Sequence, residues 1–344
     1  MHEAFADIRR RDWDTGDGET VRLAVIGCGG FARGVILPAI EECEYAEATV
    51  GVSGSADNRE EVRERFGLAT ADYDSYAAGE RADEYDAVYV ATPNRLHLPH
   101  VETAAEQGKA VICEKPLEAT VDRAERIVDT CSDAGVTLMT AYRLQTDPLF
   151  RRLREFLDDG GIGPVSKLTG DFTSPVLAGS WGPEQWRLDE ELAGGGALVD
   201  VGVYPLNVTR FLLGQEPEWV DGHTRTSEPY APVDEHVTFE VGFPDAVGSF
   251  SASFSGYPNA DFAVYGEDGV VRVTDAFQPN RGRRLTVETS AGRWELDGLG
   301  GGEVREQFDY FAHAVTTRDE VEPDGADGLA DVRLMATVYE RADD

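Results

Sequence analysis

The chain has 344 residues, of which 41% are hydrophobic, enough for two folded domains. Lys and Arg number 31 against 65 Asp and Glu, so the formal net charge is 31 − 65 = −34. Such a surface repels phosphate backbones and anionic membranes, which argues against both as partners. The acidic residues are spread along the whole chain. This pattern suits a folded, halophilic protein in molar salt, where the Debye length is only about 3 Å.

The four cysteines all lie within the first 131 residues and form neither a disulfide framework nor a CxxC metal site. Residues 1–20, a polar leader, lack the apolar core of a signal peptide, and no apolar run reaches membrane-spanning length. We therefore expect a soluble, cytoplasmic protein with free thiols and a leader of unassigned role. We expect no metal, because His97-x-x-His100 has no evident third ligand.

Strands and helices alternate through the first part of the chain. Strands are predicted at 21–26, 48–53, 85–91, 110–113 and 136–141, with helices at 58–66, 97–107 and 120–134 between them. The alternation predicts a parallel, doubly wound α/β sheet of the Rossmann type over residues 1–141.

The pattern changes after about residue 142. A helix at 148–157 precedes strands at 165–173, 236–243, 247–254, 260–265, 269–274, 284–289 and 293–296, and helices at 303–317 and 329–342 close the chain. Several strands alternate apolar and polar residues, as a half-solvated antiparallel sheet does. We expect residues 142–344 to form an α+β domain for substrate binding, with a large, mostly antiparallel open sheet. Its open face is a candidate for oligomer contact.

The turn after the first strand reads Gly27-Cys-Gly29-Gly-Phe-Ala32, which fits G-x-G-x-x-G/A. The motif follows a strand and opens a helix, the context that favours dinucleotide binding. Gly27 permits the tight turn, Gly29 lets a pyrophosphate approach the backbone, and Ala32 allows close packing of helix on strand.

The end of the second strand indicates which dinucleotide is bound. NAD-binding proteins usually place a carboxylate there to hold the ribose 2′-hydroxyl. This chain has Ser53-Gly54-Ser55, with Arg59 close behind, a set that suits a 2′-phosphate. NADP is therefore favoured, and Asp57 keeps NAD as the weaker alternative.

Two further stretches carry unusual residues. Glu114-Lys115-Pro116 ends a buried strand on two charged residues. The helix predicted over 197–213 follows Gly194-Gly-Gly and carries Asp200 and Tyr204 one turn apart, with Asn207 on the same side. Glycines before this helix are expected to leave its N-terminal amides open.

Taken in order, these motifs resemble the glucose–fructose oxidoreductase / inositol dehydrogenase (Gfo/Idh/MocA) family. The resemblance runs from about residue 21 to the C-terminus. It rests on the glycine motif, Glu114-Lys115-Pro116 and Gly194-Gly-Gly with Asp200 and Tyr204, together with Thr92-Pro93-Asn94, Tyr142-Arg143 and Trp186-Arg187. Inositol dehydrogenases carry His where this chain has Tyr204, so the inositol activity is less favoured. The acidic composition and Tyr204 are similar to NADP-using sugar oxidoreductases of halophilic archaea.

The resemblance implies oxidation of the C1 hydroxyl of D-xylose, or of a close aldose, to the lactone. Tyr204 would take the hydroxyl proton, the charge of Lys115 would favour the phenolate form of Tyr204, and a cis peptide before Pro116 would aim Lys115. Asp200 would hold the substrate or orient this pair.

Motifs and resemblance together imply two sets of contacts. The cofactor set is Gly27, Gly29, Gly30, Phe31, Ala32, Ser53, Gly54, Ser55, Arg59, Thr92, Pro93, Asn94, His97, Glu114, Lys115 and Arg143. The substrate set is Lys115, Arg143, Trp186, Arg187, Asp200, Tyr204 and Asn207. For His97 a place at the start of a helix is favoured over catalysis. Trp186 is either a wall for a sugar ring or a core residue.

Two alternatives remain. One is another oxidoreductase of the family, acting on trans-dihydrodiols, inositols or hexoses. The other is a regulator that binds the dinucleotide without catalysis, which the joint presence of Lys115, Asp200 and Tyr204 disfavours. The resemblance also implies a homodimer or homotetramer formed through the open sheet.

Overall fold

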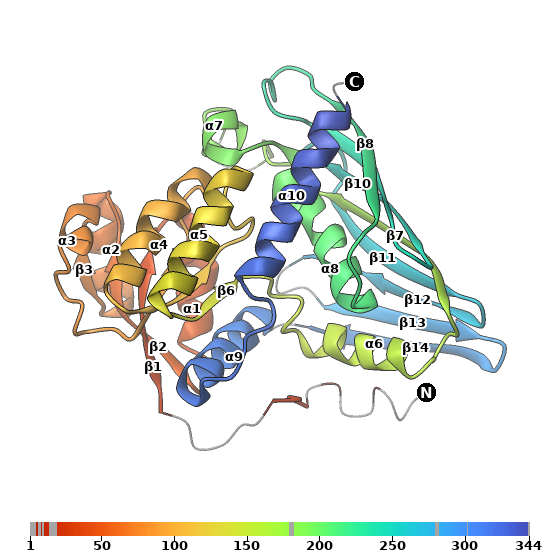
Figure 1. The fold of residues 1–344 in the computed structure, drawn as a ribbon, viewed down its shortest axis with the longest axis horizontal. Helices are drawn as coiled ribbons and strands as arrows, with labels where there is room; N and C mark the ends of the chain where they lie inside the picture. The colour runs from red at the N-terminus through yellow and green to blue at the C-terminus, as the bar shows by residue number, and fades with distance from the viewer. Residues whose placement is uncertain are drawn as a thin grey trace. The chain divides into compact units, whose positions relative to one another are not determined.

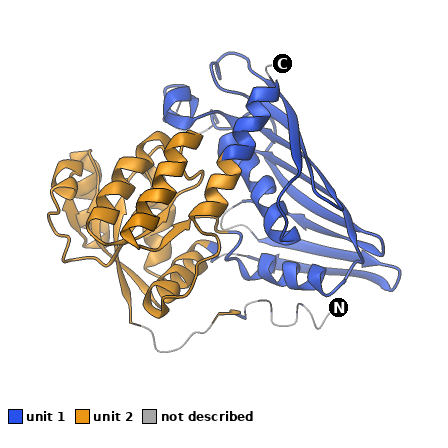
Figure 2. Ribbon diagram, viewed as in Figure 1, with its two compact units in different colours: residues 1–10, 144–303, 333–344 blue, residues 11–143, 304–332 orange. Residues whose placement is uncertain are grey.

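A computed structural model describes residues 5, 8, 10–13, 19–178, 182–278, 282–300 and 302–342. These residues form two compact units (Figure 2). Unit 1 comprises residues 1–10, 144–303 and 333–344, and unit 2 comprises residues 11–143 and 304–332. The sequence prediction assigned 142–344 to one domain, whereas residues 304–332 group with the N-terminal sheet.

Unit 2 is built on a parallel six-stranded sheet with the order β3-β2-β1-β4-β5-β6, the arrangement of a dinucleotide-binding Rossmann fold. Its strands are β1 Val21–Ile26, β2 Ala46–Val52, β3 Ala69–Ala71, β4 Ala87–Val90, β5 Ala110–Cys113 and β6 Leu138–Thr140. Its helices are a π-helical turn Ala32–Ile36, α1 Leu37–Ile40, α2 Ala56–Phe66, α3 Tyr73–Ala77, a 3₁₀ turn Asn94–Leu96, α4 His97–Glu106, α5 Val121–Ala134 and α9 Glu303–Thr317. The doubly wound prediction is confirmed.

Both faces of this sheet are buried, which explains its apolar strands. On one face, side chains of α4, α5 and the first part of α10 (Gly325–Ala342) pack on the sheet, among them Leu98, Ile127 and Leu329. On the other face, α1 and α9 contribute residues such as Leu37 and Phe308. The apolar residues of α9 complete this second core, and α9 therefore belongs to unit 2 rather than to the domain predicted for it.

Unit 1 contains an eight-stranded sheet with the order β14-β13-β12-β11-β7-β10-β9-β8. Its strands are β7 Val165–Thr173, β8 Trp219–Arg225, β9 His236–Gly242, β10 Val247–Ser253, β11 Asn259–Gly266, β12 Gly269–Thr274, β13 Arg283–Thr289 and β14 Gly292–Leu299. The neighbours β7 and β10 run parallel, and all the other pairs are antiparallel. The predicted mostly antiparallel sheet is confirmed, with β8 as a strand that the sequence analysis missed.

Helices cover one face of this sheet. They are α6 Pro148–Asp158, a π-helical turn Leu198–Gly202 and α8 Val203–Leu213, together with the last part of α10 (Figure 1). Unit 1 also contains α7 Glu190–Ala193, which contacts a 3₁₀ turn at Trp186–Leu188. In β8, β9 and β10, exposed residues alternate with buried ones that face this layer. No helix of the described chain lies on the opposite face (Figure 1). The sheet is therefore open on one side, as predicted.

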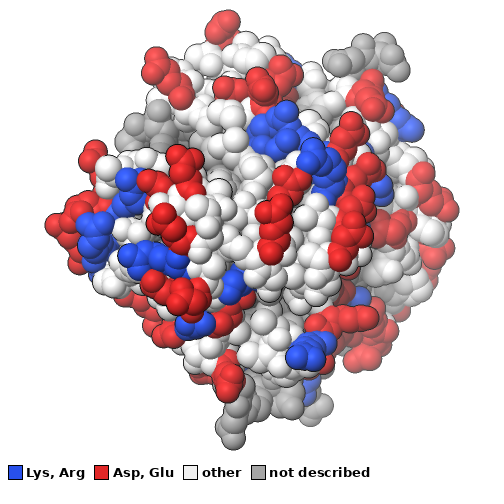
Figure 3. Space-filling model, turned by 60° about the vertical axis from the view of Figure 1, so that its left-hand side comes forward, with Lys and Arg blue, Asp and Glu red and all other residues white. Residues whose placement is uncertain are grey.

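On the face shown in Figure 3, acidic side chains are spread out rather than collected in one patch, and they outnumber the basic ones. None of the helices in the described ranges combines the length and the apolar character needed to cross a membrane. All four cysteines carry free thiols.

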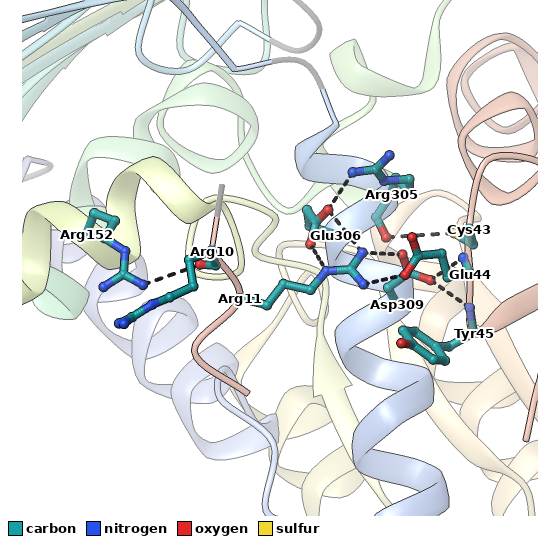
Figure 4. Close-up of polar contacts among 9 residues, drawn as sticks. All are labelled: Arg10, Arg11, Cys43, Glu44, Tyr45, Arg152, Arg305, Glu306 and Asp309. Carbon is teal, nitrogen blue, oxygen red and sulfur yellow. Dashed lines mark hydrogen bonds and ion pairs between the residues drawn. The ribbon is translucent and has the colours of Figure 1, made fainter. Parts of the chain in front are cut away.

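The described residues of the leader are anchored on their own chain. Phe5 packs against Phe156 of α6 in unit 1, with ring centroids 5.3 Å apart. In unit 2, the Arg11 guanidinium contacts three carboxylates: Glu306 at 2.8 Å, Asp309 at 2.7 Å and Glu44 at 2.9 Å (Figure 4). It also lies over the Trp13 ring at 4.7 Å. Arg11 thus ties the leader to α9 and to the segment before β2.

Replacing Arg11 by alanine is expected to destabilise the protein by about 3 kcal/mol, because Asp309 is fully buried and would lose its cation. Burial already raises the pKa of Asp309. Without Arg11 its pKa rises further, so the loss of stability is fully present near neutral pH and shrinks as the pH falls and Asp309 is protonated. Thermal unfolding in molar KCl at several pH values measures this.

The exposed pair Arg126–Glu102 provides the control. Arg126→Ala is expected to change stability by less than about 1 kcal/mol. If Arg11→Ala and Arg126→Ala lowered stability equally, the anchoring role of Arg11 would be contradicted.

Candidate active site

The glycine turn after β1 is held closely against its neighbours. Gly27 has φ +97°, and a Cβ on it would lie 2.7 Å from the carbonyl of Ala91 at the end of β4. The amides of Gly27 and Cys28 donate to the Val52 carbonyl at 2.9 and 3.2 Å. A Cβ on Gly29 would meet no atom within 4 Å, so the backbone is open there. Phe31 is 42% exposed beside the turn, whereas Ala32 is buried.

Ser53, Gly54 and Ser55 follow β2 at the same edge of the sheet. Ser53 is buried, and its hydroxyl accepts a hydrogen bond from the Ser55 amide at 3.3 Å. Ser55 caps α2 by accepting from the Asn58 amide at 3.2 Å. Arg59 donates to the Ser53 carbonyl at 2.5 Å, which holds its guanidinium at the end of β2. Asp57 is exposed in the first turn of α2.

The segment after β4 brings Thr92, Pro93, Asn94 and His97 to this edge. Thr92 Oγ1 is buried and has no hydrogen-bond partner among the described residues. The His97 ring is completely buried, and its nitrogens face the carbonyls of Thr92 at 2.9 Å and Leu117 at 3.1 Å. Burial lowers the pKa of His97. This ring joins the turns that follow β4 and β5, so its contacts favour a supporting role over the direct cofactor contact proposed from the sequence.

The Glu114-Lys115-Pro116 turn follows β5. Glu114 holds it: its carboxylate accepts from Tyr89 Oη at 2.5 Å and from the Lys115 amide at 3.2 Å. The peptide between Lys115 and Pro116 is cis, as the resemblance implied. Lys115 is half-buried just beyond the carboxyl end of the strand, where open α/β sheets bind their ligands. Tyr89 lies one strand away, and no sequence motif marked it as the partner of Glu114. Arg143, three residues beyond the end of β6, is buried.

The remaining candidates belong to unit 1. Asp200 lies in the π-helical turn and accepts from Arg187 Nε at 3.1 Å. The Arg187 guanidinium lies 4.7 Å from the centre of the Trp186 ring. Arg187 therefore contacts two other predicted substrate residues, Asp200 and Trp186. Trp186 is half-buried, which fits a wall of a site as well as it fits a core position.

Tyr204 lies at the start of α8 and is half-buried. Its ring packs against Phe172 and Phe277, with centroids 5.4 and 6.2 Å away. Asn207 is 2% exposed, and its side-chain oxygen accepts from Gln145 at 3.0 Å. Its burial favours a packing role for Asn207 over the substrate contact predicted from the sequence.

The residues of unit 2 fit a bound dinucleotide. The backbone is open at Gly29, where the motif places the pyrophosphate, and Thr92 offers a buried hydroxyl with no partner in the described part of the chain. A guanidinium and two hydroxyls lie at the end of β2, where the adenosine ribose binds in this fold. Among the described residues, no group of three or more His, Cys, Asp or Glu is arranged to hold a metal ion.

Comparison with known proteins defines the class. Residues 21–142 match the model described as the oxidoreductase family with an NAD-binding Rossmann fold, GFO/IDH/MocA, and residues 150–272 match the C-terminal domain of the same family. The chain therefore belongs to the GFO/IDH/MocA oxidoreductase family.

Individual relatives are similar over nearly the whole chain. The D-xylose 1-dehydrogenase [NADP(+)] of Haloarcula marismortui is 40% identical over 97% of this chain and 95% of its own length. The D-xylose 1-dehydrogenase (NADP(+)) 2 of Haloferax volcanii is 31% identical over 93% of this chain and 97% of its own. The crystal structure of the aldose-aldose oxidoreductase from Caulobacter crescentus, complexed with glycerol, superposes with a TM-score of 0.88 at 30% identity and covers 94% of this chain and 98% of that one.

Proposed function

We propose that the protein is an NADP-dependent sugar dehydrogenase that oxidises the C1 hydroxyl of D-xylose, or of a close aldose, to the lactone. The observation that carries the proposal is the 40% identity to a D-xylose 1-dehydrogenase [NADP(+)] along 97% of the chain. Lys115, Asp200 and Tyr204, which the family resemblance implies for the reaction, all occur in this chain.

When bound, NADP⁺ supplies the hydride acceptor for C1 of the sugar. Gly27 and Gly29 would hold its pyrophosphate, and Ser53, Ser55 and Arg59 its 2′-phosphate. Tyr204 would accept the proton of the C1 hydroxyl, and the positive charge of Lys115 would stabilise the phenolate that does so. Arg187 and Asp200, already paired with each other, would hold further hydroxyls of the sugar. Trp186 would cover an apolar face of the ring.

Initial rates of NADPH and NADH formation in molar KCl test the proposal, with D-xylose, L-arabinose, D-ribose, D-glucose and myo-inositol as substrates. Turnover of D-xylose with NADP⁺ well above that of the inositol is expected. Absence of turnover on every sugar would contradict the proposal, and a cofactor that still binds would then point to a non-catalytic regulator or to another substrate class such as trans-dihydrodiols.

A second candidate, an aldose-aldose oxidoreductase, is favoured by the structural match with a TM-score of 0.88. As the name indicates, such an enzyme would oxidise one aldose and reduce another, which would regenerate the cofactor. Conversion of a D-glucose and D-xylose mixture without added NADP⁺ would identify it, whereas a strict need for added NADP⁺ supports the dehydrogenase.

Arg59 is expected to determine the preference for NADP. Arg59→Ala should raise KM for NADP⁺ about 10- to 100-fold, because it removes a charge-assisted hydrogen bond to the 2′-phosphate. The KM for NAD⁺ should change little. Steady-state kinetics with both cofactors provide the measurement, and Arg63→Ala is the control, since Arg63 lies one turn further along α2 and pairs with Glu60. An unchanged NADP⁺ KM in Arg59→Ala would exclude this role.

We also propose a homo-oligomer formed through the open face of the eight-stranded sheet. Trp219 and Val247, both 40% exposed, lie on either side of Gly242 across three neighbouring strands. Exposed apolar residues on neighbouring strands of this face favour contact with a second copy of the chain.

A further inference from the structure

The helix that carries Asp200 and Tyr204 begins at a cap supplied from elsewhere in the chain. Asp234 Oδ1 accepts from the Gly196 amide at 2.6 Å and Oδ2 from the Leu198 amide at 2.9 Å. The Asp234 carbonyl accepts from the intervening Ala197 amide at 2.9 Å. The first amides of a helix have no acceptor within it. Here three in succession are satisfied by one residue that lies just before β9.

This arrangement corrects an expectation from the sequence. Gly194-Gly-Gly was expected to leave the N-terminal amides of the helix open. In the structure, the amides of Gly196 and Leu198 donate to the carboxylate of Asp234, a residue that is only 5% exposed. The negative charge also interacts favourably with the helix dipole at this end.

Tyr339 of α10 fixes the carboxylate in turn. Its hydroxyl donates to Asp234 Oδ1 at 2.6 Å and lies 3.3 Å from the Gly196 amide. Burial and the adjacent Asp234 raise the pKa of Tyr339, which keeps the hydroxyl a neutral donor. Burial likewise raises the pKa of Asp234, and its bonds to Tyr339, Leu198 and Gly196 oppose that shift.

The glycines are required by this packing. Gly195 has φ +148°, and a Cβ on it would lie 2.3 Å from the Tyr339 hydroxyl. A Cβ on Gly196 would lie 2.1 Å from the Asp234 carbonyl oxygen. No side chain fits at either position while Asp234 and Tyr339 keep their places. The glycine run therefore allows the loop to approach the cap closely.

The cap connects directly to the candidate catalytic residues. The Gly196 carbonyl accepts from the Asp200 amide at 3.0 Å, and Asp200 in turn holds Arg187. The π-helical turn Leu198–Gly202 leads without a break into α8, where Tyr204 is the second residue. Irregular π-helical turns of this kind occur frequently at functional sites. A displacement at Gly196 would therefore pass to Asp200 and Tyr204 through the backbone.

We propose that Asp234 is a positioning residue for the sugar oxidation: held by Tyr339, its carboxylate sets the start of the helix that carries Asp200 and Tyr204. The inference rests on the proposed function for its kinetic consequence, although the capping contact itself does not depend on it. Asp234 and Tyr339 are not expected to touch the substrate or the cofactor.

The test compares Asp234→Ala, Asp234→Asn and Tyr339→Phe with wild type. For Asp234→Ala we expect kcat on the preferred aldose to fall about 10- to 100-fold, because small misplacements of reacting groups slow reactions by such factors. Tyr339→Phe should lower kcat about three- to tenfold through the loss of one hydrogen bond. Asp234→Asn keeps one acceptor oxygen and should lie between wild type and the alanine variant. The Kd for NADP⁺, measured by fluorescence, should stay within about twofold, since the cofactor candidates of the glycine turn and β2 lie in unit 2.

Asp72→Ala is the matched control. Asp72 caps α3 of unit 2 through the Ser75 amide at 2.9 Å, whereas the helix of Tyr204 belongs to unit 1. This variant should lose some stability without a change in kcat. If Asp234→Ala does not fold, Asp234→Asn and Tyr339→Phe still decide the question. If Asp234→Asn and Tyr339→Phe both fold and both keep the kcat of wild type, the proposal is overturned.

Hydrogen exchange separates this inference from the proposed function. The amides of Gly196–Leu198 should exchange faster in Asp234→Asn and Tyr339→Phe than in wild type or Asp72→Ala. If wild type oxidises no sugar but this pattern appears, the proposed function fails and only the capping role of Asp234 stands. If sugar is oxidised and neither the exchange nor kcat responds, the positioning role fails alone.

Discussion

Lys115→Met is expected to lower kcat for aldose oxidation by about 10²- to 10⁴-fold, the range of positioned acid–base groups. Methionine preserves much of the length of the side chain but removes the ammonium that would stabilise the Tyr204 phenolate. The turn itself should persist, because Glu114 holds it through Tyr89 and the Lys115 amide, neither of which changes. Steady-state rates with NADP⁺ and D-xylose, together with NADP⁺ binding, measure the effect.

Lys109→Met is the matched control, since Lys109 lies directly before β5 at its opposite end and donates to the Tyr85 carbonyl at 2.7 Å. It should keep kcat within about threefold, as expected for a change remote from the reacting groups. Near-normal turnover of Lys115→Met would show that this lysine has no part in the mechanism. Lys115 would then be only a charged residue in a solvated turn.

Tyr204→Phe is expected to lower kcat by a similar factor, about 10²- to 10⁴-fold, while the Kd for NADP⁺ stays close to wild type. Phenylalanine keeps the ring, so the packing against Phe172 and Phe277 should survive. Only the hydroxyl that would accept the proton is lost. The same rate and binding assays apply.

Tyr257→Phe provides the comparison because Tyr257 is 92% exposed, in the connection between β10 and β11. It is expected to behave as wild type. If Tyr204→Phe were as active as Tyr257→Phe, another group would have to be the base.

The parts of the fold that the sequence predicted well are those with strong local signals. The strands of unit 2 are buried on both faces and read as apolar runs closed by glycine or proline, as at Gly27, Pro93 and Pro116. The prediction missed β8 because Asp221, Gly222 and His223 interrupt any apolar pattern. Val220 and Gly222 are its two buried residues. The three-residue β3 is too short to show a period.

Contacts between distant segments were not accessible to the sequence analysis. The apolar stripe of α9 predicts a buried helix but not which sheet buries it, and the structure places it against unit 2. Asp234 precedes a strand in a stretch with no motif, and its role depends on amides 36 residues earlier in the chain. The leader anchor at Arg11 likewise depends on carboxylates of α9.

At the candidate site, the motifs predicted where the turns lie but not the role of each side chain. The glycine turn, the Ser53–Arg59 segment and the Lys115 turn lie at the carboxyl edge of the unit 2 sheet, as their position after parallel strands predicted. His97 and Asn207 were assigned to ligand contacts because they share those motifs, yet both are buried and bonded to neighbouring residues. Burial of a polar side chain is a tertiary property that spacing alone does not reveal.

Oxidation at C1 is tested most directly by following the hydrogen that is removed from the sugar. The enzyme would oxidise D-xylose carrying deuterium at C1 in the presence of NADP⁺, and the reduced cofactor would be examined by mass spectrometry and NMR. Hydride transfer from C1 should place deuterium on the nicotinamide ring of NADPH, with xylonolactone as the first product. Reduced cofactor that carries no deuterium, or carries it only when C2 or C3 of the sugar is labelled, would contradict oxidation at C1.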